Sequence, residues 1–277
     1  MTLVFVLLLI GCVLGAASAF VFWTEPLSIL PLLERLTPNI LYRVRTELPL
    51  VALSFDDGPH PVFTPQVLDI LQHYDARATF FVIGDRALRH PDLLAAIRAG
   101  GHEVANHYFQ NGPTLFHSDA TFLHNLEQTE TALDLAAKPA LDPSPSFRAE
   151  REIPLLFRPP GGLAWPRQIQ LARQRGYTCV LGCAYPHDPI HPPVGYIRWL
   201  VEKNLVPGAI VILHDGIADP RRTLQALPAI LEAGPQKGPA FHHRRRAAVS
   251  RVRSRRGEKQ IPHFVRDDTV RERTAAP

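Results

Sequence analysis

The chain contains 277 residues, 46% of them hydrophobic, so it is long enough for one substantial core and for one or two domains. Its three cysteines are too few for a disulfide framework. The net charge of +4 is unevenly distributed, because residues 235–277 hold 12 Lys and Arg against 4 Asp and Glu, which leaves the first 234 residues net acidic. The basic pI therefore describes a tail and does not indicate a basic folded body.

Residues 3–23 contain no charged side chain. A helix of that length, at about 1.5 Å per residue, would cross the roughly 30 Å hydrocarbon core of a membrane. We therefore expect residues 1–23 to be a transmembrane anchor or a signal segment, and the protein to be membrane-anchored or secreted, in the cell envelope. The side of the membrane stays open, because residues 17–19 look like a cleavage site, whereas Arg35, Arg43 and Arg45 favour a cytoplasmic position for the rest of the chain.

Residues 24–48 are rich in Pro and Leu and are predicted to be a linker. After it, apolar runs typical of buried strands alternate with segments of helical period. Strands are expected at 51–55, 78–83, 103–105, 155–157, 178–181 and 209–213, and helices at 65–74, 91–99, 120–136, 166–175, 195–204 and 221–233. This alternation predicts an α/β domain over residues 49–234, with a mostly parallel sheet that is open or closed into a barrel.

Polar side chains follow the predicted strands at the points where the strands end. They are Asp56 with Asp57, His107, Arg158, Asp188 and His214 with Asp215. In a parallel α/β sheet these ends meet at one rim, where ligands bind. Taken singly, each has a plain structural explanation, since Asp-Asp-Gly-Pro forms a good turn and a lone His is usually a surface or core residue. Five strand ends that all carry such residues predict a functional site.

Four segments carry a resemblance, and their order and spacing agree with it. They are LSFDDGP at 53–59, GHEVANH at 101–107, RPPGG at 158–162 and PGAIVILHD at 207–215. Over roughly residues 50–232 the chain resembles the polysaccharide deacetylase (NodB-homology) family, of the carbohydrate esterase type. The resemblance implies a distorted (β/α) barrel that is a catalytic domain, and hydrolysis of N-acetyl groups on chitin- or peptidoglycan-like glycan.

The resemblance also implies a role for each matching residue. Asp56 would be the general base, His214 the general acid, and Asp57 and His107 ligands of a divalent metal ion, typically Zn²⁺. An amide carbonyl is a poor electrophile, so a Lewis-acidic ion that polarises it and activates water suits this chemistry. Arg158 would hold the Asp56 carboxylate ionised and oriented.

The chain departs from the family pattern at the second motif, where Asn111 occupies the position of a further His ligand. An amide oxygen binds a borderline metal more weakly than an imidazole does. We therefore expect Asp57, His107 and Asn111 to hold Zn²⁺ loosely, with His117 as an alternative donor.

The third and fourth motifs also differ from the family pattern. Gly161 stands where an aromatic residue is usual, which removes a wall of the sugar groove. In the fourth motif Tyr185 replaces the first Asp, Asp188 fits the second and Pro189 replaces a Trp. These changes leave open whether an acid tunes His214.

After residue 233 the family's final strand is expected, yet residues 235–277 stay basic and show no strand pattern. We predict a barrel that lacks its last strand and has an exposed sheet edge, followed by a disordered tail. The tail offers only two Phe residues for stacking, so we expect no nucleic-acid binding.

The leading interpretation is a metal-dependent hydrolase that removes N-acetyl groups from amino-sugar polymers, with a glycan substrate and, through residues 3–23, the membrane as partners. The alternative is a catalytically impaired deacetylase-like protein that binds glycan, which Asn111 and Tyr185 favour. A third interpretation is a membrane-tethered interaction protein that acts through its basic tail.

Overall fold

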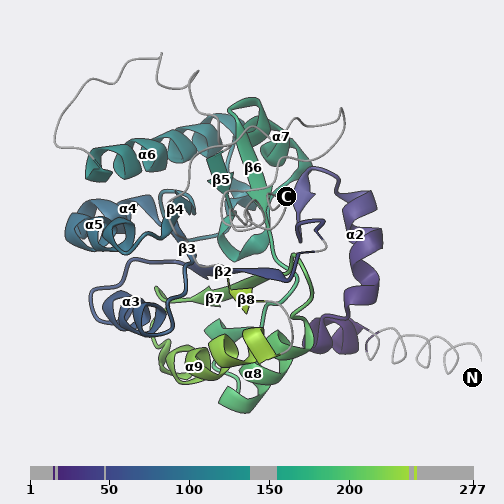
Figure 1. Cartoon of the computed structure of the whole chain (residues 1–277). Coiled ribbons are helices and arrows are strands. Elements are labelled where there is room, and N and C mark those ends of the chain that lie inside the picture. The colour runs from purple at the N-terminus through teal and green to yellow at the C-terminus, as the bar shows by residue number, and fades with distance from the viewer. Residues whose placement is uncertain (1–14, 16–17, 47, 138–154, 237–239, 242–277) are drawn as a thin grey trace, which may run out of the picture.

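The structure is a computed structural model that describes residues 15, 18–46, 48–137, 155–236 and 240–241 (Figure 1). Among these residues the strands form one sheet in the spatial order β1-β6-β5-β4-β3-β2-β7, and β8 pairs with β2. The strands are β1 (Ile40–Leu41), β2 (Leu50–Asp56), β3 (Thr79–Val82), β4 (Glu103–Asn106), β5 (Leu155–Phe157), β6 (Tyr177–Val180), β7 (Ile210–His214) and β8 (Ala240–Phe241). Their pairings are all parallel, which confirms the predicted α/β architecture.

The sheet curls into a distorted barrel until its two ends meet. Just beyond β6, Cys183 N donates to Ile210 O at 3.1 Å, and Ile212 N donates to Ala184 O at 3.0 Å. The outer edge of β7 is therefore covered, and the predicted exposed edge is wrong. The segment that covers it belongs to no named strand, so an apolar strand pattern could not indicate it. Beyond β7 the described residues contain one further strand, the two-residue β8, which pairs with β2.

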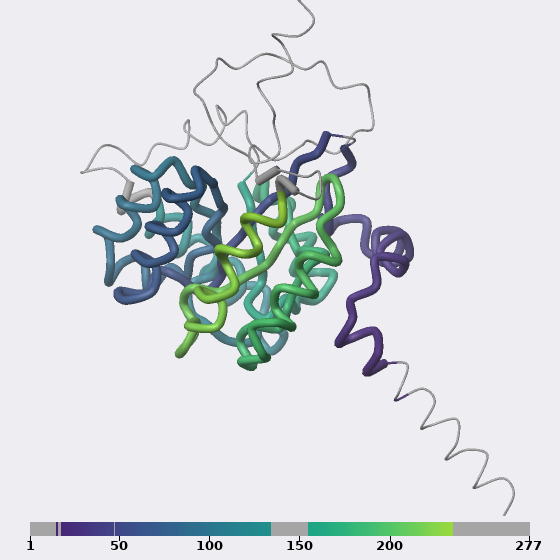
Figure 2. Tube along the Cα trace, turned by 60° about the horizontal axis from the view of Figure 1, so that its bottom comes forward, coloured from purple at the N-terminus to yellow at the C-terminus, as the bar shows by residue number. Residues whose placement is uncertain are grey.

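Helices surround the curled sheet (Figures 1 and 2). They are α2 (Leu30–Leu36), α3 (Phe63–His73), α4 (Gly84–Arg89), α5 (Pro91–Ala99), α6 (Asp119–Ala137), α7 (Pro166–Gln174), α8 (Val194–Lys203) and α9 (Arg221–Gln236). In both views α2 lies on the side of the domain opposite α4 and α5. The helices bury apolar side chains in the core, as α3 does with Val67 and Leu71, which have no exposed surface.

Alternation along the strands decides which side chains face the interior of the barrel. One apolar cluster takes residues from every strand of the curled sheet, so it fills the interior: Leu41, Leu50, Ala52, Phe81, Ala105, Leu156, Val180 and Ile210. Successive side chains of a strand point to opposite faces. Ser54 and Asp56 therefore continue the inner row of β2. By the same count His107, Arg158 and His214 follow inner residues of their own strands by two or four positions, which places the polar residues at the carboxyl end of the interior.

Residues 24–48 differ from the predicted linker. A 3-10 helix (Leu27–Ile29), α2 and β1 all lie within them. Leu30 and Leu41 are 5% and 8% exposed, and β1 pairs with β6. Leu30 and Leu41 thus pack against the domain, because apolar side chains gain more from burial than from remaining in water.

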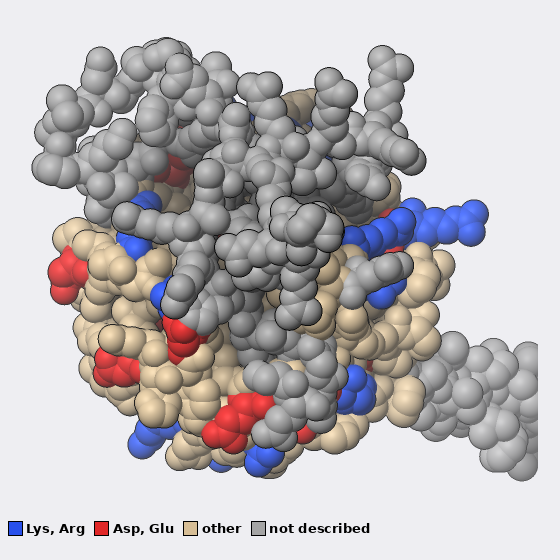
Figure 3. Space-filling view, viewed as in Figure 1, with Lys and Arg blue, Asp and Glu red and all other residues tan. Residues whose placement is uncertain are grey.

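The two ends of the chain lie mostly outside the described residues. Most of residues 3–23 are outside the described part of the chain, and so is the basic tail apart from residues 235–236 and 240–241. Within the described part of the chain, no helix is long and apolar enough to cross a membrane. On the face in Figure 3, acidic and basic side chains of the described residues are scattered among neutral ones.

Candidate active site

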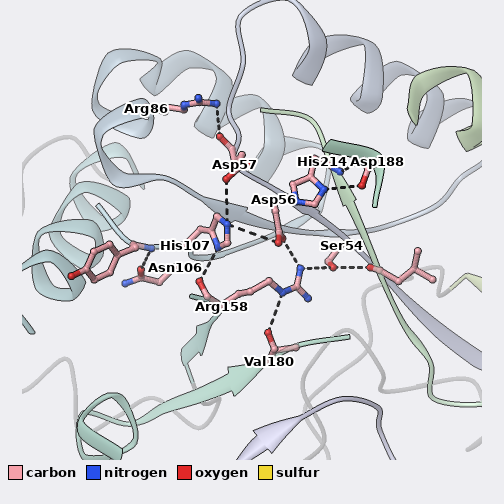
Figure 4. Close-up of polar contacts among 12 residues, drawn as sticks. Ser54, Asp56, Asp57, Arg86, Asn106, His107, Arg158, Val180, Asp188 and His214 are labelled. Carbon is pink, nitrogen blue, oxygen red and sulfur yellow. Dashed lines mark hydrogen bonds and ion pairs between the residues drawn. The ribbon is translucent and has the colours of Figure 1, made fainter. Parts of the chain in front are cut away.

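Six of the predicted site residues meet at the carboxyl end of the barrel interior (Figure 4). They are Asp56, Asp57, His107, Arg158, Asp188 and His214, which lie at or beyond the carboxyl ends of β2, β4, β5, β6 and β7. Each is at most 9% exposed. Burial of this many ionisable groups is costly unless they are paired and hydrogen-bonded, so their partners determine what the site can do.

Asp56 forms a buried ion pair with Arg158. Arg158 Nη1 lies 2.5 Å from Asp56 Oδ1 and also donates to Ser54 Oγ at 2.8 Å, while Nε donates to Val180 O at 3.0 Å. The guanidinium lies 3.9 Å from the centre of the Phe81 ring. Because four contacts fix the guanidinium, the Asp56 carboxylate is held in one orientation with a full counter-charge.

His107 points its second ring nitrogen at two carboxylates. Its Nδ1 lies 2.8 Å from Arg158 O, and since a carbonyl can only accept, Nδ1 carries a hydrogen. Its Nε2 lies 3.4 Å from Asp57 Oδ1 and 3.9 Å from Asp56 Oδ2. Three acceptor atoms in such proximity attract a cation, either a proton or a metal ion.

Asp57 occupies a backbone conformation that side chains rarely adopt, with φ of 68°. Its carbonyl accepts a hydrogen bond from Arg86 Nη1 at 2.7 Å. Burial alone would raise the pKa of the Asp57 carboxyl, but the hydrogen bond and charge of His107, with smaller contributions from His214 and Arg86, lower the pKa to about 2. Asp57 is therefore ionised at neutral pH.

His214 is held by Asp188 through two hydrogen bonds. The ring Nδ1 lies 2.9 Å from Asp188 Oδ1, and the backbone N of His214 donates to Asp188 Oδ2, also at 2.9 Å. Thr223 Oγ1 donates to the same Oδ2 at 2.8 Å. Burial would lower the pKa of His214, but the charge and hydrogen bond of Asp188, aided by Asp56 and Asp57, raise it to about 9. An acid therefore does tune His214, although Tyr185 replaces one candidate.

Asp215 lies behind the Asp57 turn. It has no exposed surface, accepts a hydrogen bond from Thr64, and its Oδ1 has no partner among the described residues. Burial raises the pKa of this carboxyl to about 7. Its side chain fills the space beside Gly58, where an added Cβ would lie 2.5 Å from Asp215 Oδ1. The packing explains why a glycine follows the Asp pair.

The loops after β4 and β5 form the rim of the site next to His107 and Arg158. Phe116 and Trp165 on these loops are 87% and 56% exposed, and Trp165 Nε1 donates to Leu115 O at 2.8 Å. Gly161 lies in a 3-10 turn (Pro160–Gly162) with φ of 64° and no atom within 4 Å of an added Cβ. The open space at Gly161 is thus flanked by loops that carry exposed aromatic rings.

The predicted metal ligands were tested against this geometry. Among the described residues, no group of three or more His, Cys, Asp or Glu side chains could hold a metal ion. Asn111 is exposed, and His117 Nδ1 lies 2.9 Å from the Tyr108 hydroxyl. A catalytic zinc ion has three protein ligands. Asp57 and His107 alone do not fit such a site, so Zn²⁺ stays a prediction.

The sequence analysis did not identify several partners of the site residues. Ser54 and Thr223 hydrogen-bond Arg158 and Asp188, and Arg86 belongs to α4, a helix that the hydrophobic pattern did not indicate. Ser54 alone had a sequence signal, because it stands on the same face of β2 as Asp56. Thr223, in the first turn of α9, had none.

The curled parallel sheet and the buried ionisable side chains at its carboxyl end define an α/β protein with a polar site. The sequence matches the polysaccharide deacetylase family over residues 43–180. It is 36% identical over 207 residues to a peptidoglycan-N-acetylglucosamine deacetylase of Bacillus cereus, an alignment that covers 74% of this chain and 91% of that protein. It is also 36% identical over 176 residues to a chitooligosaccharide deacetylase of Sinorhizobium fredii, covering 63% and 75%.

A solved structure shows the same fold. The crystal structure of a peptidoglycan N-acetylglucosamine deacetylase in complex with 4-naphthalen-1-yl-N-oxidanyl-benzamide superposes with a TM-score of 0.66 at 25% identity, covering 74% of this chain and 90% of that one. The chain belongs to the polysaccharide deacetylase family.

Proposed function

We propose that this protein hydrolyses the N-acetyl amide of amino sugars in a glycan polymer. The observation that carries the proposal is a carboxylate and an imidazole that are each held by a buried partner within one site. Asp56 is paired with Arg158, while Asp188 raises the pKa of His214 to about 9, which favours the imidazolium. One base and one acid are therefore available together near neutral pH.

These two groups account for both proton transfers of amide hydrolysis. Asp56 takes a proton from a water molecule as the water oxygen attacks the carbonyl carbon of the acetyl group. The C–N bond then breaks as His214 gives its proton to the leaving amine, so that acetate and a free amino sugar result. Arg158 and Asp188 keep the two groups in position throughout, because each is buried and hydrogen-bonded. No step is assigned to a metal ion, since among the predicted ligands in the described part of the chain only Asp57 and His107 lie together.

The proposed substrate class rests on the relatives and on the rim. Both the Bacillus cereus and the Sinorhizobium fredii relatives are named as deacetylases of N-acetylated glycans. Phe116 and Trp165 expose large apolar surfaces beside the site, as ligand-binding surfaces often do. We include in the proposal a location in the cell envelope, with residues 3–23 as membrane anchor or secretion signal, because that segment carries no charge.

A second candidate is a glycan-binding protein without turnover. The observation that favours it is the exposed Asn111, which leaves Asp57 and His107 as a two-ligand set. Such a protein would keep the barrel and the rim but would lack the electrophilic assistance that amide hydrolysis usually needs.

Acetate release from N-acetylglucosamine oligomers and from peptidoglycan separates the two candidates. The full chain is assayed with chelator, without addition, and with added Zn²⁺ or Co²⁺. Turnover that Asp56→Asn abolishes supports the proposed hydrolase, and its response to chelator shows whether a metal is required. The matched control is Asp219→Asn, which alters an exposed carboxylate bonded to Arg221. Glycan binding with no acetate under any condition would instead establish the second candidate.

A further inference from the structure

The segment around residues 18–25 lies against the loop of residues 185–188, which leads into the 3-10 turn Asp188–Ile190. Phe22 stacks on the His187 ring at 4.2 Å between ring centres. His187 Nε2 lies 2.8 Å from Phe22 O, to which it donates. Tyr196 OH donates to Trp23 O at 2.8 Å, so the contact extends to α8. Residues that precede the barrel in sequence therefore form one wall of this loop.

Glu25 makes the polar contacts at the centre of that wall. Its Oε2 accepts the backbone N–H of Tyr185 at 2.8 Å, and its Oε1 lies 3.8 Å from His187 Nε2. Its own carbonyl accepts Asn204 Nδ2 at 3.3 Å. Burial raises the pKa of the Glu25 carboxyl to about 7, so a neutral amide matches it in shape and matches the charge of its protonated form.

The loop that Glu25 holds ends at the residue that orients His214. His187 has φ of 53°, a left-handed conformation that a non-glycine residue adopts at a cost, so the loop needs external contacts to keep it. The next residue, Asp188, accepts both hydrogen bonds from His214. The Tyr185 ring also contacts the His187 and His214 rings, with ring centres 4.7 Å and 5.8 Å apart, respectively.

We infer that Glu25 is a positioning residue for His214, which it orients through Tyr185, His187 and Asp188. The catalytic consequence rests on the proposed function, in which His214 is the acid, whereas the geometric part does not. Glu25 thus links the segment that follows the uncharged N-terminal residues to the Asp188–His214 pair of the site. Without the Glu25 side chain, the loop samples other positions and the Asp188 carboxylate leaves His214 for part of the time.

Amide exchange at His214 tests the inference directly, because its backbone N–H is bonded to Asp188 Oδ2. In Glu25→Ala we expect this amide to exchange at least about tenfold faster, the scale of one hydrogen bond to a charged group, while the neighbouring Leu213 amide keeps its rate. Glu25→Gln should restore the native rate, because its amide oxygen can still accept from Tyr185. Glu34→Ala is the matched control, since Glu34 pairs with Arg43 and Arg45 instead.

An unchanged His214 rate in Glu25→Ala, or an equal acceleration at Leu213, would overturn the inference, the second because it would show a general loss of stability. If the protein deacetylates glycan, Glu25→Ala should also lower kcat about tenfold with KM unchanged. The exchange measurement needs no turnover. A protein without deacetylase activity would therefore contradict the proposed function but not the positioning of His214 by Glu25. Rescue by Glu25→Gln in exchange and in kcat together would support the positioning role.

Discussion

Replacing Asp188 by Asn should remove the protonated form of His214 at neutral pH. The amide keeps the size of the carboxylate side chain, and its oxygen can still accept from the His214 backbone and from Thr223, so the loop should remain folded. The substitution removes the negative charge beside His214 Nδ1, which offsets the effect of burial on the His214 pKa. Burial then dominates, and the pKa of His214 should fall from about 9 to 6.5 or below.

The size of the effect can be calculated from these two values. At pH 7.5 a group with a pKa near 9 is about 97% protonated, and one with a pKa of 6.5 is about 9% protonated. The imidazolium population should therefore fall about tenfold or more. If His214 is the acid, acetate release at pH 7.5 should fall by at least the same factor, and the alkaline limb of kcat should move from near pH 9 to pH 6.5 or lower.

NMR titration of the His214 ring is the primary assay, because it does not require turnover, and the pH dependence of kcat is the second. Asp219→Asn serves as the control, since this exposed carboxylate is bonded to Arg221 and not to His214. A His214 pKa that stays near 9 in Asp188→Asn would refute the reasoning. It would mean that Asp56 and Asp57 suffice to hold the proton.

Three further predictions concern stability and metal binding. Arg158→Met should destabilise the protein by about 3–5 kcal/mol in urea unfolding, because it leaves Asp56 as an unpaired buried charge, and a change below about 1 kcal/mol would contradict the buried pair. Folding raises the pKa of His214 from 6.5 to about 9, so its protonation should add about 3 kcal/mol to the free energy of unfolding. This contribution should be complete below pH 6.5 and lost as pH rises to 9. His214→Gln should therefore flatten that part of the pH profile of stability measured in urea. Asp57→Ala and His107→Ala should each lower bound Zn²⁺ in equilibrium dialysis, whereas Asp56→Asn should not, and full occupancy in the His107 variant would show that it is no ligand.

The strands and the residues just after them could be predicted because they are local in sequence. A continuous apolar run such as 209–213 marks a strand buried on both faces, and the polar residue after it, His214, falls at the rim by the geometry of parallel sheets. All six strands expected from such runs overlap observed strands to within one residue at each end, and the helix at Pro91–Ala99 has the predicted bounds.

Contacts between segments far apart in sequence could not be predicted. The outer edge of β7 forms two hydrogen bonds with Cys183 and Ala184, which lie in a segment without strand periodicity. The hydrogen bond from Tyr185 to Glu25 joins residues that are 160 positions apart. Residues 24–48 were predicted to be a linker because they are rich in Pro and Leu, yet burial of Leu30 and Leu41 gives the segment a fixed place. Composition describes such a segment without indicating what it packs against.

The pairing of β2 with β7 has a consequence for the order in which the chain acquires its structure. β2 ends at Asp56 and lies beside β7, which ends at His214, so this pair of strands joins residues separated by most of the domain. Contacts of such long sequence separation form slowly, and during synthesis the β7 segment leaves the ribosome late. Until then β2 presents an unpaired apolar edge, and the site lacks His214. Newly made chains are therefore expected to depend on chaperones or rapid export, and mutations that slow β7 docking should lower the yield of soluble protein more than the stability of the finished fold.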